Sequence, residues 1–275
     1  MHTIMKNTNK SFKTGIKAFD YYFGQHARGG DSWLMFGQSG GGKTNLACQT
    51  AGFTAADGKM VLYITTQNKP IMILQRTYCA VQSIPYANFK MLVSQGDDQV
   101  RDAFSEWVTT LGSNFVIFDW ESINGMCYEE KYKHILDLYY TKHGRIPDLT
   151  VLDQIQDVLP QQFDDHIQKR DAFNMVATVV ATKAVELDNV AIVVAMANSK
   201  CTGKADLNEK DTADSRTLCD SMTGVIGITS RVENDYRKAT VYSNDQYLVV
   251  CKSREGNQRI MVKRQFDMCR FVGAY

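Results

Sequence analysis

The sequence lacks the features of a secreted or membrane-bound protein. Its seven cysteines are scattered, with no C-x-x-C pair and no histidine at zinc spacing, so neither a disulfide framework nor a zinc site is indicated. The first ten residues are not apolar, and the most apolar region, 175–197, is interrupted by Lys183, Glu186 and Asp188, so no signal peptide or membrane span is expected. A net charge of +1 provides no overall attraction to nucleic acid, and any such binding must be local. We therefore expect a cytoplasmic protein without membrane contact.

No linker, internal repeat or low-complexity tract divides the 275 residues. A hydrophobic content of 44% is enough for one large core. We predict a short N-terminal arm over residues 1–12 and a single domain over residues 13–275.

The most informative segment is GQSGGGKT, residues 37–44, which matches G-x-x-x-x-G-K-S/T at every fixed position and follows the apolar run 33–36. Such a loop turns its N–H groups around phosphates, and the following helix directs its positive dipole end at the same charge. The alternative is a glycine-rich turn without a ligand. Lys43 would contact the β- and γ-phosphates of ATP, and Thr44 would bind Mg²⁺. The predicted nucleotide-binding residues are Gly37, Gln38, Ser39, Gly40, Gly41, Gly42, Lys43, Thr44 and Asn45.

Strands and helices alternate along the rest of the chain. Hydrophobic patterns predict buried strands at 60–64, 115–118, 149–152 and 190–196, and helices at 70–81, 100–111, 129–142 and 166–187. This alternation predicts an α/β fold with a mostly parallel central sheet, helices on both faces and ligands beyond the carboxyl ends of the strands. From Val225 onward, short strands without helices predict C-terminal antiparallel hairpins.

Asp153 ends the apolar run 149–152, which is the Walker B arrangement of a carboxylate at the tip of a buried strand. There it would hold the Mg²⁺ shell opposite Thr44. The alternative is an acidic residue that only forms a turn.

Several segments resemble, in order, the RecA-like motor domain of DnaB-type replicative helicases. LDQIQDV, with Asp153 and Gln156, resembles I-D-Y-L-Q-L, and FKTGIKAFD resembles T-G-x-x-x-L-D. The family segment F-F-S-L-E-M, with an arginine that follows it, is matched by VLYITTQNKPIMILQR, in which the arginine is Arg76. The segment L-A-K-E-L-x-V-P-V-I-A-L-S-Q-L is matched by KAVELDNVAIVVAMANSK. The late motif A-K-x-R-x-G is matched by CKSREG. The resemblance spans residues 11–271. It implies a RecA-like P-loop NTPase of superfamily four, in a compact phage or plasmid-type form.

The resemblance also implies an activity: a hexameric ring that hydrolyses ATP with Mg²⁺, translocates on single-stranded DNA and unwinds the duplex. Bacterial relatives carry an N-terminal domain that contacts primase and a linker helix, and neither fits before Ser11. We therefore expect a minimal helicase, or a separate primase or loader. Two alternatives stay open: a RecA- or KaiC-like recombination ATPase, and a nucleotide-gated ring that binds single-stranded DNA with weak hydrolysis.

Two positions depart from the family pattern. Gln67 stands where the family has the glutamate that polarises the attacking water, and an amide cannot accept a proton as a carboxylate does, so hydrolysis is expected to be slow. Gln67 is either native or introduced to trap ATP. Alternatively, Gln67 is only a polar residue at a strand end, and an acid such as Asp57 polarises the attacking water. Asn198 stands where the family has a glutamine that senses the γ-phosphate.

Lys252 and Arg254 lie two residues apart, and on a strand they would face the same side next to a turn. The resemblance implies that they reach the γ-phosphate bound by the neighbouring subunit. The alternative is a solvated basic hairpin.

Two loops qualify for DNA contact through phosphates. Residues 159–170 end in Lys169 and Arg170, and residues 199–216 include Lys200, Lys204 and Arg216. Residues 214–217 partly match the family's D-L-R-E-S-G element, which makes Arg216 the best single candidate.

Overall fold

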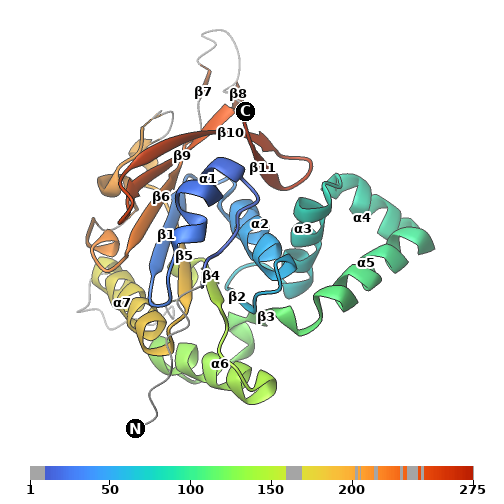
Figure 1. Ribbon diagram of the computed structural model, residues 1–275, viewed down its shortest axis with the longest axis horizontal. Helices are drawn as coiled ribbons and strands as arrows, with labels where there is room; N and C mark the ends of the chain where they lie inside the picture. The colour runs from blue at the N-terminus through green and yellow to red at the C-terminus, as the bar shows by residue number, and fades with distance from the viewer. Residues whose placement is uncertain are drawn as a thin grey trace.

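The computed structural model describes residues 10–158, 169–201, 204, 206–213, 216–229, 232–233, 241–242 and 245–274. A nine-stranded sheet in the order β11-β10-β9-β6-β1-β5-β4-β2-β3 forms its centre (Figure 1). The strands are β1 (Ser32–Gly37), β2 (Val61–Thr65), β3 (Phe115–Asp119), β4 (Leu149–Asp153), β5 (Val190–Met196), β6 (Gly224–Ile228), β9 (Asp245–Lys252), β10 (Gln258–Gln265) and β11 (Arg270–Gly273). Two short strands, β7 (Val232–Glu233) and β8 (Val241–Tyr242), pair separately.

The six strands from β6 to β3 are parallel, and β9, β10 and β11 extend the sheet antiparallel. Every residue of β1, β2 and β4 is buried, because helices cover both faces of the parallel part. The predicted fold class, a mostly parallel α/β sheet with C-terminal antiparallel hairpins, is therefore confirmed.

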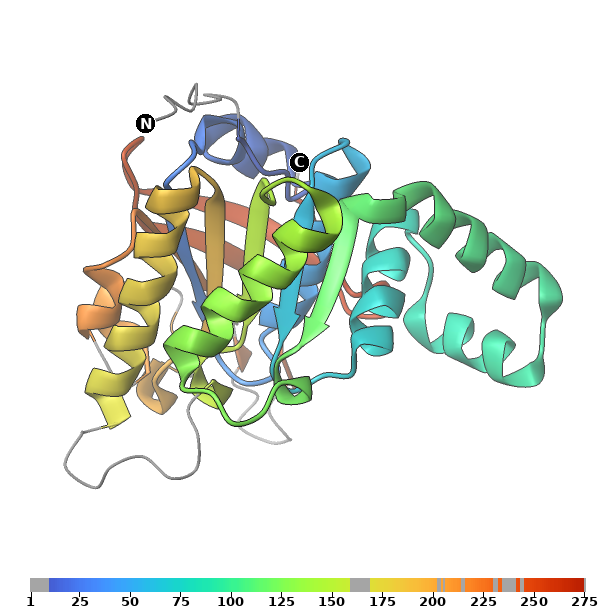
Figure 2. The same ribbon diagram turned by 90° about the horizontal axis from the view of Figure 1, so that it is seen from below.

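Alternate residues of β1 enter two separate cores. Trp33 and Met35 pack on the side of α2 (Lys43–Ala56) and α3 (Pro70–Gln82). Leu34 and Phe36 pack on the side of α6 (Tyr128–His143) and α7 (Lys169–Leu187), which lie in front of the sheet in Figure 2. This layering leaves the carboxyl end of β1 open for the loop that follows it.

Two helices extend away from the sheet, α4 (Tyr86–Gln95) and α5 (Asp98–Leu111) (Figures 1 and 2). They are attached to α3 by an aromatic cluster in which the ring centroid of Tyr78 lies 5.3 Å from that of Phe89 and 5.1 Å from those of Phe104 and Trp107. Helix α4 was not predicted from the sequence. Among the helices that the described residues form, none has the length and apolar character needed to cross a membrane.

The segment before β1 includes α1 (Lys17–Tyr22) and is fixed by Asp20. One carboxylate oxygen of Asp20 accepts hydrogen bonds from the backbone N–H and the hydroxyl of Thr14, both at 2.7 Å. The other accepts from the N–H of Gly15 at 3.0 Å. The Thr14 carbonyl in turn accepts from Gln49 of α2 at 2.6 Å. This motif therefore anchors the lead-in segment to the helix that follows the phosphate loop.

Candidate nucleotide site

The predicted phosphate loop connects β1 to α2. Gly40 and Gly42 adopt left-handed φ values of 69° and 95°, and a Cβ atom on Gly42 would lie 2.7 Å from the Phe271 ring. The Gln38 carbonyl accepts a hydrogen bond from the N–H of Gly41 at 2.9 Å, which closes the turn. Gly37 ends β1, and Ser39, Gly40, Gly42, Lys43, Thr44 and Asn45 line one cavity of about 480 Å³. The structure thus brings the predicted nucleotide-binding residues together.

Lys43 is only 8% exposed, and its Nζ donates to the Gln38 carbonyl at 3.1 Å. Burial lowers the pKa of Lys43, the nearby Asp153 opposes this shift, and the nearby Arg264 adds to it. A desolvated ammonium group with a second cation close by is an environment that favours a bound anion.

Asp153 lies beside Thr44, as predicted. The Thr44 hydroxyl is 3.4 Å from one carboxylate oxygen, and the Tyr63 hydroxyl donates to the other at 2.7 Å. Asp153 is 3% exposed; burial raises its pKa, and the hydrogen bonds from Tyr63 and Thr44, with Lys43 nearby, act in the opposite direction. The hydroxyl and carboxylate oxygens are ligands that suit Mg²⁺, and a divalent cation would supply the positive charge that this buried carboxylate lacks.

Cations line the cavity without any acidic counterpart. Lys43, Arg76 and Arg264 are among its lining residues, and none of the described lining residues is aspartate or glutamate. The cavity therefore fits a polyanion such as a triphosphate in both charge and position.

Arg264 is a lining residue that the sequence interpretation missed. It is 7% exposed, its guanidinium carbon lies 3.0 Å from the centroid of the Phe266 ring, and burial lowers its pKa to about 10. Its Nε makes no hydrogen bond within the described part of the chain. One signal was available: in β10, Arg264 continues the buried alternation of Ile260 and Val262. A buried cation on the wall of this cavity, with Nε unpaired, suits an anionic ligand.

Gln67 follows β2, is exposed and lines the same cavity. The alternative acid, Asp57, is wrong as a water-polarising residue. It forms the C-terminal cap of α2, whose first residue is Lys43, and it forms an ion pair with Lys13. A helix of 14 residues is about 21 Å long, so Asp57 lies a full helix length from the phosphate loop.

Asn198 lies next to the phosphate loop but is held by local contacts. Its carbonyl accepts from Gln38 Nε2 at 2.6 Å, and its Oδ1 accepts from the N–H of Lys200 at 3.0 Å. Asn198 thus connects the loop to the turn η5 (Ser199–Cys201), which carries one of the predicted DNA-contacting lysines.

The predicted cationic pair is at the opposite end of the sheet. Lys252 pairs in register with Val225, the second residue of β6, and its Nζ donates to the carbonyls of Cys219 and Asp220 at 2.8 and 3.3 Å. Arg254 Nη1 lies 2.9 Å from Oδ1 of Asp31, directly before β1. Since a strand rises about 3.3 Å per residue, the six-residue β1 puts roughly 20 Å between this pair and the phosphate loop. The pair does not contact its own nucleotide cavity.

The predicted DNA-contacting residues are only partly described. Lys200 is exposed, and Lys204 forms an ion pair with Asp211 at 2.6 Å. Lys169 begins α7 and Arg216 begins η7 (Arg216–Cys219), but the side chains of Lys169, Arg170 and Arg216 and all of residues 159–168 lie outside the described residues.

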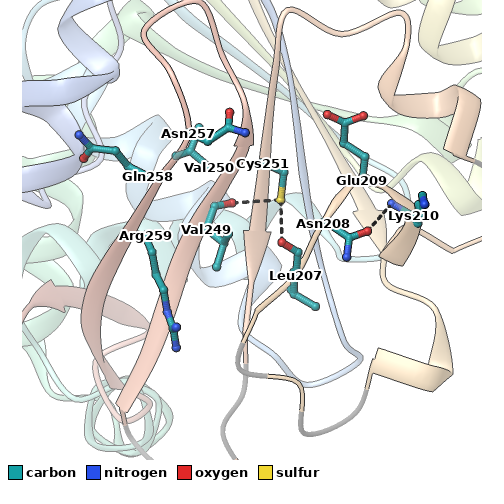
Figure 3. A pocket seen from close by; sticks show the side chains of 10 residues that line it. All are labelled: Leu207, Asn208, Glu209, Lys210, Val249, Val250, Cys251, Asn257, Gln258 and Arg259. Carbon is teal, nitrogen blue, oxygen red and sulfur yellow. Dashed lines mark hydrogen bonds between the residues drawn. The ribbon is translucent and has the colours of Figure 1, made fainter.

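A second cavity, of about 600 Å³, lies between residues 207–210 and the β9–β10 hairpin (Figure 3). Cys251 Sγ donates to the Leu207 carbonyl at 3.3 Å, so this hairpin is attached to the segment between Lys204 and Arg216.

Comparisons with known proteins support the fold. No protein-family model matches the chain, and no curated protein matches its sequence. The ATPase domain of G40P matches with a TM-score of 0.77 and 16% identity, over 98% of this chain and 93% of that one. A DnaB-like replicative helicase, solved in a study of its interactions with primase, matches with a TM-score of 0.75 and 16% identity, over 96% of this chain and 62% of that one. The chain therefore has the RecA-like fold of DnaB-like helicase ATPase domains, as the sequence resemblance implied.

Proposed function

We propose that this chain is the motor of a DnaB-like replicative helicase, which hydrolyses ATP as a hexameric ring, translocates on single-stranded DNA and unwinds the duplex. The observation that carries this proposal is the cavity at the carboxyl end of β1: its described lining includes three cations and no acid, and the lining residue Thr44 lies beside Asp153. The helicase fold gives that cavity its context.

The cradle binds and orients the triphosphate. The loop N–H groups and the N-terminus of α2 hold the phosphates, and the Lys43 ammonium group lies at the β- and γ-phosphates. Thr44 and Asp153 would hold Mg²⁺, which neutralises phosphate charge when bound. Gln67 orients the attacking water without taking its proton, and Asn198 senses the γ-phosphate through its contacts with the loop.

Lys252 and Arg254 act on the nucleotide of the adjacent subunit. Their position at the other end of the sheet from their own cavity supports a role in trans, because neither residue contacts the cradle of its own chain. Hydrolysis in such a ring depends on correct docking of neighbours, and each subunit responds to the nucleotide state of the next.

Single-stranded DNA binds through its phosphates. Arg216, Lys200 and Lys204, with Lys169 and Arg170 at the start of α7, provide the contacts, which are independent of sequence. A separate primase or loader completes the replication machinery.

The decisive experiment is electron microscopy of the protein with a slowly hydrolysed ATP analogue and a single-stranded oligonucleotide, with Lys43→Ala as the variant that lacks nucleotide binding. Six-membered rings are expected for the unmodified chain and not for the variant. A strictly monomeric protein under saturating conditions would exclude the ring motor. Filaments would instead favour a recombination ATPase.

A second candidate is a ring that binds single-stranded DNA under nucleotide control with weak hydrolysis. Gln67 favours it, since no carboxylate lines the described cavity. Both candidates need the same ring and differ in turnover.

A further inference from the structure

The contact between Arg254 and Asp31 deepens the proposed function and rests on it. We infer that Asp31 is a positioning residue: its carboxylate holds one nitrogen of Arg254 so that the rest of the guanidinium faces the nucleotide of the neighbouring subunit. Asp31 would thus act on a phosphate that it never touches.

Asp31 is fixed by its own turn. The residue is 4% exposed, its Oδ2 accepts from the N–H of Arg28 at 2.8 Å, and its own N–H donates to the Arg28 carbonyl at 2.9 Å. The preceding Gly30 donates to the Asn189 carbonyl at 2.8 Å, which ties the turn to the start of β5. The carboxylate therefore has one orientation, set by the central strands.

Arg254 is bound at one point and open elsewhere. Its Nη1 lies 2.9 Å from Asp31 Oδ1, while 60% of its side chain is exposed. Asp31 Oδ1 accepts no hydrogen bond among the described residues, so the contact is an ion pair that holds Nη1 by charge, and the other N–H donors of the guanidinium group stay available. This geometry suits a group that must meet a phosphate from another chain.

Burial makes this ion pair different from a second one on the same hairpin. Arg259 lies 2.8 Å from Asp206, a nearly equal distance, but the Asp206 side chain is 76% exposed and that of Asp31 only 5%. Water can replace Arg259 at Asp206, so that pair adds little. Release of Arg254 would leave a buried carboxylate without its countercharge, which is strongly unfavourable. Arg254 therefore keeps its contact with Asp31 when a neighbour docks.

Lys252 attaches the turn end of the hairpin as well. Its Nζ donates to the carbonyls of Cys219 and Asp220, two residues from the position of Arg254. Two anchors on one short segment reduce the motion of the guanidinium before the neighbouring nucleotide arrives, and such pre-organisation contributes to rate rather than to nucleotide affinity.

The test compares Asp31→Asn with the matched control Asp206→Asn, both in the full chain with ATP and single-stranded DNA. We expect kcat for ATP hydrolysis to fall roughly 100-fold in Asp31→Asn, because a misplaced catalytic group costs about that factor. KM and the affinity for a fluorescent ATP analogue should not change. Asp206→Asn should hydrolyse ATP normally. Asp31→Glu, which keeps the charge but displaces it, should give an intermediate kcat and shows that loss of folding is not the cause.

Two further measurements separate this inference from the proposed function. In the Arg254→Ala background, Asp31→Asn should have no additional effect on kcat, because the two residues act as one unit. Mixed rings of Lys43→Ala and Asp31→Asn subunits should recover hydrolysis. In them, the correctly placed Arg254 of a Lys43→Ala subunit would act on the nucleotide bound by an adjacent Asp31→Asn subunit. If Arg254→Ala abolishes turnover while Asp31→Asn leaves or raises it, positioning is wrong and the trans role stands. If Arg254→Ala leaves turnover intact, both the positioning role of Asp31 and the trans role of Arg254 are wrong.

Discussion

The two ends of the sheet are built in opposite ways. At the carboxyl end, one chain supplies all the residues predicted to hold the nucleotide and Mg²⁺, and Lys43 and Asp153 are buried there with pKa values shifted by burial. At the amino end, Lys252 and Arg254 already have partners in their own chain and do not contact the cradle. The proposed function therefore assigns nucleotide binding to the single chain and requires a second copy for the full set of charges around a γ-phosphate.

The largest expected effect comes from the amino end. Arg254→Ala should lower kcat by at least about 10³-fold, the lower bound for a trans-acting arginine. Nucleotide affinity should stay nearly unchanged, because the cradle is intact. Steady-state ATPase assays with equilibrium binding of a fluorescent analogue measure both quantities.

Arg259→Ala is the matched control for Arg254→Ala, since it removes another paired arginine of the same hairpin. Its turnover should be near normal. If Arg254→Ala instead weakened nucleotide binding and left turnover per bound ATP unchanged, the assignment of binding to the carboxyl end and of hydrolysis in trans to the amino end would be wrong.

The next largest effect concerns Gln67 in the cavity at the carboxyl end of the sheet. Gln67→Glu should raise kcat by about 10²-fold or more, since a positioned general base contributes roughly 10²–10⁴-fold. Gln67 lines the cavity without any carboxylate among its described neighbours there, so the new acid would have no competitor. Asn68→Asp, which adds the same charge one residue later, should give no gain. If Gln67→Glu does not increase turnover and fork unwinding, the ring that only binds DNA is favoured.

The same contrast explains what the sequence could predict. The phosphate loop, Asp153 and the parallel strands follow from local patterns, and the predicted strand at 190–196 has the bounds observed for β5. Helix α4 places Tyr86, Phe89 and Val93 on one face, but this face is short and only Phe89 is fully buried, so its periodicity is a weak signal. The pair of Asp31 with Arg254 depends on a contact between segments far apart in the chain, and no local motif marks it. Arg264 has only the signal of its buried position in the alternation of β10, and its place in the cavity depends on long-range packing.

A smaller effect concerns stability. Burial raises the pKa of Asp153, so the folded protein binds this proton more readily than the unfolded chain, and stability falls as pH rises through the folded pKa. Asp153→Asn should therefore raise the free energy of unfolding at neutral pH, and this gain should disappear below the unfolded pKa of about 3.9. Urea unfolding from pH 3 to 8 without nucleotide measures this difference.

Asp211 is the control of opposite sign. It is buried, but hydrogen bonds led by that from Lys204 outweigh burial and lower its pKa. Its contribution to stability is present above the unfolded pKa and is lost as pH falls through the folded pKa. Asp211→Asn should thus be destabilised at neutral pH and approach the unmodified protein in acid. If the two substitutions changed the free energy of unfolding in the same direction at neutral pH, the opposite pKa shifts of Asp153 and Asp211 would be contradicted.

The smallest effect lies outside both ends, in DNA affinity. Arg216→Ala should weaken binding to single-stranded DNA equally for all sequences and reduce the slope of log affinity against log salt by about 0.7, the value for one phosphate contact on a single strand. Lys204→Ala should reduce it less, because Lys204 is paired with Asp211 and releases fewer counterions on binding. Fluorescence anisotropy over a salt series measures both slopes. An unchanged slope in Arg216→Ala would exclude this residue from the DNA path and would not bear on the proposed roles of the nucleotide cavity and of the β9–β10 hairpin.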